Sequence, residues 1–203
     1  MKLFLSSMAI SAEQLPEFLR LASKSNPADI HLALIENAAD GEAGDKTWVL
    51  ENRKALRAHG FRVELIDLND KALAAKLANC DVIWLGGGNI FYLRRLLKET
   101  QADQLITNLV KAGKVYGGGS AGAIVAGPTL QHFETADVVE ESSSVVTAGL
   151  HLTDTVVVPH YDNPQFADHM RLIATKLEAE GYAVARLTDA QALVVNDTQE
   201  KII

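Results

Sequence analysis

The chain has 203 residues, of which 48% are apolar, a formal net charge of -7 and an isoelectric point near 5.3. This length suffices for one domain with a full core, and no Pro-, Gly- or Ser-rich linker divides it. We therefore expect residues 1–203 to form a single domain. The acidic balance and the lack of Lys/Arg clusters argue against nucleic-acid binding, which normally needs a basic patch.

Neither a membrane span nor a disulfide is expected. The first residues, "MKLFLSS", have too few apolar positions for a signal-peptide core. No segment approaches the roughly 18 apolar residues of a membrane-spanning helix. The one cysteine, Cys80, cannot form an internal disulfide, which is typical of a reducing compartment. The prediction is a soluble cytoplasmic protein.

Short β-rich runs alternate with amphipathic helical patterns through the first two thirds of the chain. Strands are predicted at 2–7, 30–39, 61–68, 81–88 and 114–119, and helices at 15–24, 48–59, 71–79, 89–100 and 102–113. Such alternation indicates a parallel sheet with helices on both faces. Later strands are predicted at 142–150, 154–161, 182–187, 192–197 and 200–203, with a helix at 165–181. This late cluster suggests an antiparallel extension on one edge.

Three motifs follow apolar runs and could meet at one edge of the sheet: "GGGN" at 86–89, "GGGSAG" at 117–122 and "PHYDN" at 159–163. In open parallel sheets, sites form beyond the carboxyl ends of the strands. Residues 118–122 fit the G-x-S-x-G nucleophile elbow, in which tiny neighbours let Ser120 sit on a sharp strand-to-helix turn. A glycine-rich loop without catalytic function is the alternative. "GGGN" is either a turn or a donor of backbone N–H groups to an oxyanion.

A serine nucleophile needs a base, normally a histidine that a carboxylate orients. Of the six histidines, His160 is the one directly after an apolar strand, and it is the predicted base. The chain order Ser, acid, His leaves five carboxylates between the two as candidates: Glu134, Asp137, Glu140, Glu141 and Asp154.

Together, "GGGN", "GGSAGA" and "PHY" resemble the peptidase E family of serine dipeptidases, which includes the aspartyl dipeptidases and is related to the cyanophycinases. The resemblance runs from the first strand to at least Phe166. It implies a flavodoxin-like α/β fold akin to class I glutamine amidotransferases, with serine in place of cysteine at the elbow. It also implies hydrolysis of dipeptides or short peptides through an acyl-enzyme, with no metal or organic cofactor.

Carried over by position, the resemblance gives each motif residue a role. Ser120 matches the nucleophile, His160 the base, and Gly88 and Ala121 the oxyanion donors. Asp137 is the first choice for the acid and Glu134 the second. Asn89 and Arg171 are the predicted substrate-binding residues, Arg171 as the counterpart of an arginine that binds an N-terminal Asp side chain.

The expected partner is a small peptide, with no nucleic acid or membrane, and the chain is expected to be a monomer or homodimer. The sequence leaves two alternatives open. One is an amidotransferase-like hydrolase of the same fold, which serine at position 120 argues against. The other is a non-catalytic binding homologue with an incomplete triad.

Overall fold

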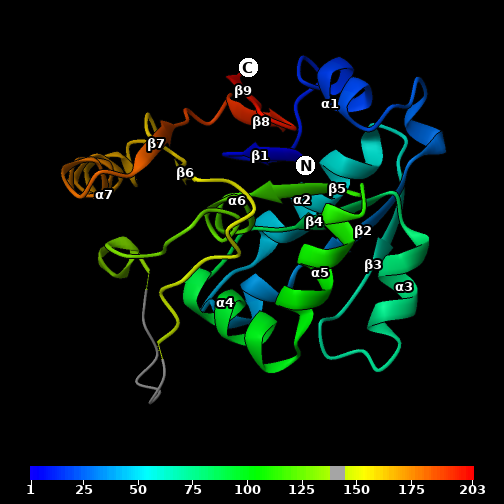
Figure 1. The fold of residues 1–203 in the computed structure, drawn as a ribbon, viewed down its shortest axis with the longest axis horizontal. Helices are drawn as coiled ribbons and strands as arrows, with labels where there is room; N and C mark the ends of the chain where they lie inside the picture. Colours follow the sequence, from blue (N-terminus) through cyan, green and yellow to red (C-terminus); the bar gives the residue numbers. More distant parts are fainter. Residues whose placement is uncertain (138–144) are drawn as a thin grey trace.

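A computed structural model describes residues 1–137 and 145–203, and its main feature is a seven-stranded sheet with the order β3-β2-β4-β5-β1-β8-β9 (Figure 1). The parallel strands are β1 (Lys2–Ser6), β2 (His31–Ile35), β3 (Arg62–Leu65), β4 (Val82–Leu85) and β5 (Val115–Gly119). The strands β8 (Ala192–Asn196) and β9 (Gln199–Ile202) continue the sheet antiparallel to β1. The predicted α/β fold with an antiparallel C-terminal edge is confirmed.

Helices cover both faces of this sheet. One face carries α1 (Leu15–Leu21) and α2 (Thr47–Ala58), whereas the other carries α3 (Leu73–Asn79), α4 (Ile90–Glu99), α5 (Ala102–Lys111) and α6 (Ala121–Ile124). Because strand side chains alternate in direction, the two faces have separate cores. Phe4 and Trp84 pack against Phe18, while Leu5 and Tyr116 belong to the opposite core. Strands buried on both faces account for the nearly continuous apolar runs.

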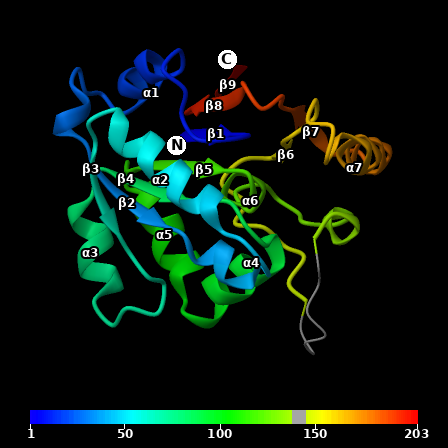
Figure 2. The same cartoon turned by 180° about the vertical axis from the view of Figure 1, so that it is seen from behind.

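The prediction for the later strands is partly wrong. The strands β6 (Thr155–Val158) and β7 (Ala183–Arg186) form a separate parallel pair, joined by α7 (Ala167–Ala179). Figures 1 and 2 show this unit beside the main sheet. A helix between two strands brings the chain back in the same direction, so the pair is parallel rather than antiparallel.

Local structure departs from the predictions at two further places. Residues 142–144 of the predicted strand 142–150 lie outside the described residues, and Ala148 forms only an isolated bridge with Thr129. The predicted strand 30–39 ends at Ile35, because the 3-10 helix η2 (Asn37–Gly41) follows. Two other 3-10 turns are η1 (Pro27–Asp29) and η3 (Phe133–Thr135).

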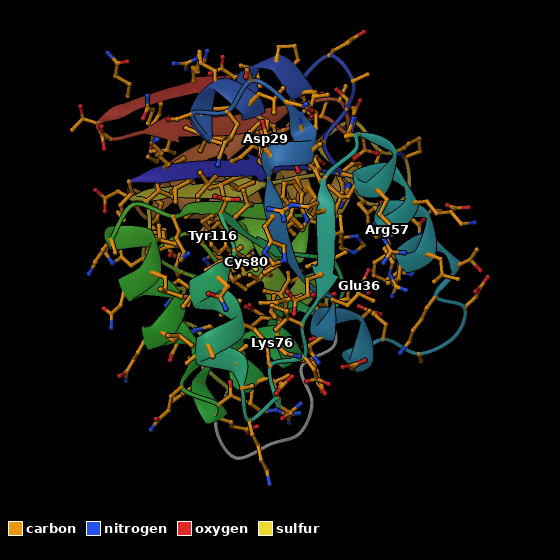
Figure 3. The ribbon with its side chains drawn as sticks, turned by 90° about the vertical axis from the view of Figure 1, so that its right-hand side faces the viewer. Asp29, Glu36, Arg57, Lys76, Cys80 and Tyr116 are labelled. Carbon is orange, nitrogen blue, oxygen red and sulfur yellow. The ribbon has the colours of Figure 1, made fainter. Side chains whose placement is uncertain are left out.

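The carboxyl ends of four parallel strands lie level with one another. Ser6 pairs with Gly119, and Leu85 pairs with both Ile35 and Gly118. Below this edge, the Tyr116 side chain, labelled in Figure 3, is fully buried, and its hydroxyl donates to the Gly122 carbonyl oxygen at 2.6 Å. The loops after these strands therefore start from one rigid edge. Within the described residues, no helix is both long and apolar enough to cross a membrane.

Candidate active site

Ser120 occupies a strained turn between β5 and α6. Its backbone has φ 49° and ψ -112°, a conformation that L-residues rarely adopt. The neighbouring glycines make this turn sterically possible. A Cβ added to Gly118 would lie 2.4 Å from the Gly122 carbonyl oxygen, and one added to Gly122 would lie 2.0 Å from the Leu85 carbonyl oxygen. This is the geometry of a nucleophile elbow, which exposes the serine hydroxyl above the sheet.

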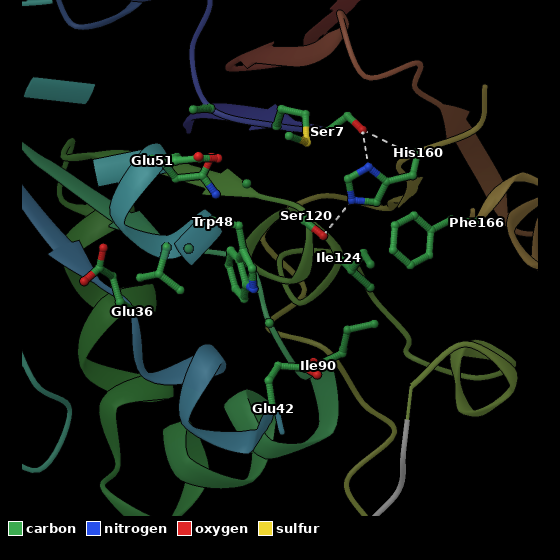
Figure 4. A pocket seen from close by; sticks show the side chains of 18 of the residues that line it. Ser7, Glu36, Glu42, Trp48, Glu51, Ile90, Ser120, Ile124, His160 and Phe166 are labelled. Carbon is green, nitrogen blue, oxygen red and sulfur yellow. Dashed lines mark hydrogen bonds between the residues drawn. The ribbon is translucent and has the colours of Figure 1, made fainter. Parts of the chain in front are cut away.

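His160 reaches Ser120 from the separate β6-β7 unit. It directly follows the β6 end at Val158-Pro159, has φ 57°, and is buried. Its Nε2 lies 2.9 Å from Ser120 Oγ (Figure 4). The structure thus brings together the predicted nucleophile and the predicted base, although they come from different sheets.

The carboxylate beside His160 is Asp189, which lies between β7 and β8. Its Oδ1 is 2.6 Å from His160 Nδ1. Since a carboxylate only accepts, Nδ1 donates to it, and Nε2 is left to accept from Ser120. The sequence predicts that Asp137 or Glu134 orients the imidazole, but in the structure Asp189 occupies that position. Asp137 accepts from the backbone N–H of Ile90 at 2.7 Å, and Glu134 is exposed.

The one remaining candidate for the acid within the described residues does not contact His160. Asp154 is exposed and bonds to His151. Glu140 and Glu141 lie outside the described residues.

Neighbouring polar groups hold Asp189 and His160 in place. Ser7, just after β1, accepts from the His160 backbone N–H at 2.8 Å and donates to Asp189 Oδ1 at 3.1 Å. Asn163 donates to Asp189 Oδ2 at 2.8 Å, and the Asp189 backbone N–H donates to Asp162 at 2.9 Å. Burial alone would raise the pKa of Asp189, but the hydrogen bonds from His160, Asn163 and Ser7 outweigh it, so this pKa lies below its ordinary value. Asp189 is therefore ionised and able to stabilise a protonated imidazole.

The loops after β4 and β5 present free backbone donors. Gly88 has φ 131°, and a Cβ there would lie 2.3 Å from the Ala38 carbonyl carbon, so the position requires glycine. Among the described residues, no acceptor is found for the N–H groups of Gly88 and Ala121. Ala121 is the first residue of α6, where a backbone N–H has no partner within the helix. Both groups are available to a developing oxyanion.

A cavity of about 570 Å³ opens in front of Ser120. Apolar and aromatic side chains form much of its wall, including Trp48, Ile90, Ile124 and Phe166 (Figure 4). A Cβ added to Gly87 would lie 3.3 Å from Ser120 Cβ and 3.7 Å from Trp48 Cζ3, so Trp48 lies close to the nucleophile loop.

Asp137 also lines this cavity. Burial raises its pKa to about 6; the Ile90 N–H lowers it, and the nearby Glu42 carboxylate raises it further. The predicted acid is thus a wall residue of the site rather than a partner of His160.

The two predicted substrate-binding residues do not line the cavity. The Asn89 side chain is buried and caps α4, where its Oδ1 accepts from the Tyr92 N–H at 2.8 Å. Arg171, on α7, has a side chain that is 56% exposed, bonds to Asp168 at 3.2 Å and lies over the Tyr161 ring. The contacts described for Asn89 and Arg171 thus do not direct either side chain toward Ser120.

One group of residues has the ligand types of a metal site. The ligand atoms of His31, Glu64 and Cys80 lie within 4.8 Å of one another; His31 begins β2, Glu64 lies within β3 and Cys80 follows α3. His31 Nε2 already pairs with Glu64 at 3.0 Å, and burial raises the pKa of the Cys80 thiol to about 11. This group lies at the opposite end of the strands from Ser120, so it takes no part in the site.

Sequence reasoning missed Asp189 because it limited the acid to residues between Ser120 and His160. The available signal was the position of Asp189 shortly after a predicted strand, at 182–187. That strand pairs in parallel with the one before His160, with Val158 opposite Arg186. The two strands therefore end at the same edge, and the residues that follow them meet.

Comparisons with known proteins agree on one family. Residues 6–203 match peptidase family S51. An uncharacterised peptidase of Listeria monocytogenes is 35% identical over 64% of this chain and 65% of its own, so the match spans just under two thirds of that relative. An uncharacterised peptidase of Pasteurella multocida is 32% identical over 78% of this chain and 77% of its own. A peptidase E of Nostoc is 32% identical over 58% of this chain and 47% of its own.

The fold has a close counterpart among solved structures. A crystal structure at 1.5 Å of a protein described as a peptidase E from Listeria monocytogenes superimposes with a TM-score of 0.85 and 29% identity. The superposition covers 100% of this chain and 97% of that one.

Proposed function

Because the chain belongs to peptidase family S51, and is therefore a peptidase of the serine type, we propose that it hydrolyses dipeptides or other short peptides through an acyl-enzyme at Ser120. The observation that carries the proposal is the chain of hydrogen bonds from Ser120 to His160 to Asp189, with distances of 2.9 Å and 2.6 Å. These three groups have the geometry of nucleophile, base and orienting carboxylate.

The first half of the reaction forms the acyl-enzyme. Ser120 Oγ attacks the carbonyl carbon while its proton passes to His160 Nε2, and Asp189 stabilises the imidazolium. The N–H groups of Gly88 and Ala121 would hold the oxyanion of the tetrahedral intermediate. The imidazolium then gives its proton to the leaving amine as the C–N bond breaks. Water, deprotonated by His160, attacks the ester in the second half and releases Ser120.

The strained turn at Ser120 supports catalysis over a purely structural glycine loop. A conformation that costs about 1–3 kcal/mol persists only where the surroundings impose it, and such residues cluster at functional sites. Here Gly118 and Gly122 permit the close backbone contacts of the turn, and the Ser120 N–H donates to the Ser6 carbonyl oxygen at 3.1 Å. The same geometry speaks against a non-catalytic homologue, and Ser120 in place of a cysteine speaks against a glutaminase.

A Ser120→Ala variant tests the proposal. We expect wild-type protein to hydrolyse members of a dipeptide panel and to bind a fluorophosphonate covalently at Ser120. The variant should lose about 10³-fold or more in kcat and form no adduct. Free glutamine, assayed for ammonia release, should not be a substrate. Full hydrolysis by Ser120→Ala would refute the proposal.

A further inference from the structure

Four carboxylates line the cavity in front of Ser120. Figure 4 shows three of these acidic side chains, Glu36, Glu42 and Glu51, on the Trp48 side of Ser120. Asp137 is the fourth carboxylate on the wall. Among the described lining residues, the one Lys or Arg is Arg53.

Arg53 is already used within the protein. Its Nε lies 3.2 Å from one oxygen of Glu36 and its Nη2 lies 2.5 Å from the other, a two-point ion pair. A guanidinium held in this way has its fork of donors directed at a carboxylate. The Arg53–Glu36 pair therefore adds no net charge to the cavity and offers little to a second carboxylate.

The other three carboxylates keep their charge toward the cavity. None of Glu42, Glu51 and Asp137 forms an ion pair with a Lys or Arg in the described part of the chain. Glu42 and Asp137 are close enough that the charge of Glu42 raises the pKa of Asp137.

The indole ring of Trp48, like the carboxylates, favours a cation in the cavity. Its ring lies beside Gly87 and near Ser120, and the open face of an indole attracts cations. Arg171, in contrast, has a side chain that is 56% exposed, is paired with Asp168 and is not among the residues that line the cavity. The carboxylates and the aromatic wall both favour a positively charged group over a negatively charged one.

We propose that this site selects short peptides whose first residue carries a basic side chain and discriminates against Asp and Glu there, with Glu42 and Asp137 as the main determinants of this selectivity. The inference rests on the proposed peptidase function. It replaces the preference for N-terminal Asp that the motif resemblance implies, because Arg53, the one Lys or Arg in the described cavity lining, is already paired with Glu36.

The experiment compares dipeptides that share leucine as the second residue. Their first residues are Lys, Met, Glu and Asp, so the α-ammonium and the terminal carboxylate stay constant while the side-chain charge changes. We expect kcat/KM to fall from Lys through Met to Glu and Asp, with about tenfold or more between Lys and Glu. Raising the ionic strength should shrink this ratio, because salt screens partly exposed charges.

Variants then test the two determinants. Glu42→Gln and Asp137→Asn remove one charge each with little change in shape, and each should lower the Lys-to-Glu ratio by about threefold to tenfold. Asp154→Asn is the matched control, since its side chain is 94% exposed and outside the cavity lining, and it should leave the ratio unchanged.

The outcomes separate this inference from the proposed function. If kcat/KM for the Glu or Asp dipeptide equalled or exceeded that for the Lys dipeptide, the proposed selectivity would be wrong, while the proposed peptidase function would stand. A Lys preference that survives the double variant of Glu42 and Asp137 would also overturn it. No turnover of any dipeptide, together with no fluorophosphonate adduct at Ser120, would refute both.

Discussion

Replacing Asp189 by Asn tests which carboxylate orients the His160 imidazole. The amide of the new side chain must place its NH₂ group at the position of one of the two carboxylate oxygens. At the Oδ2 position it faces the Asn163 Nδ2 donor, and Asn163 cannot simply flip because its Oδ1 accepts from the Gln165 N–H at 3.0 Å. At the Oδ1 position the NH₂ group faces His160 Nδ1 and forces the tautomer that no longer accepts from Ser120. Either arrangement damages the site.

The size of the effect follows from the charge that is lost. Two unit charges about 4 Å apart interact by about 4 kcal/mol at an effective dielectric constant of about 20, which corresponds to about 10³ in rate. Asp189 has a side chain that is 32% exposed, and solvent screening reduces this figure. We therefore expect Asp189→Asn to lower kcat by about 10²–10³, with a smaller change in KM.

The assay measures kcat and KM for the best dipeptide with Asp189→Asn and with Asp137→Asn in parallel. Circular dichroism and the urea unfolding midpoint show that each variant is folded. If Asp189→Asn kept kcat within about tenfold of wild type while Asp137→Asn lost about 10³, our reasoning about the orienting carboxylate would be wrong.

Three further predictions concern the surroundings of the site. Gly122→Ala should lower the free energy of unfolding by about 3 kcal/mol in urea denaturation, because the new Cβ would lie 2.0 Å from the Leu85 carbonyl oxygen; an unchanged midpoint would contradict this. Asp137→Asn should raise stability at pH 8 by up to about 3 kcal/mol, since a folded-state pKa of about 6 against 3.8 makes ionised Asp137 unfavourable in the fold. That gain should shrink as pH falls from about 6 to 3.8 and vanish below it, so a gain that persists at pH 3 would exclude this cause. Arg171→Ala should change kcat/KM for an Asp-Leu dipeptide by less than about twofold, because Arg171 is exposed and outside the cavity lining; a larger loss would restore it as a substrate-binding residue.

The amino-acid sequence by itself determined the layered α/β fold and two members of the site. Strand and helix alternation has strong periodicity, and residues after parallel strands meet at one edge whatever the details of packing. Ser120 was identifiable because its turn tolerates only tiny neighbours, which leave a readable motif. His160 was identifiable because it directly follows an apolar run.

Only the tertiary structure decided the rest. Asp189 reaches His160 because β6 and β7 pair in parallel beside the main sheet, and this pairing depends on packing across distant segments rather than on local pattern. Likewise, no spacing rule shows that Asp137 lies on the cavity wall, that Asn89 caps α4, or that Arg171 faces solvent. Carboxylates, amides and guanidinium groups are common on every surface, so their roles depend on which neighbours the fold brings to them.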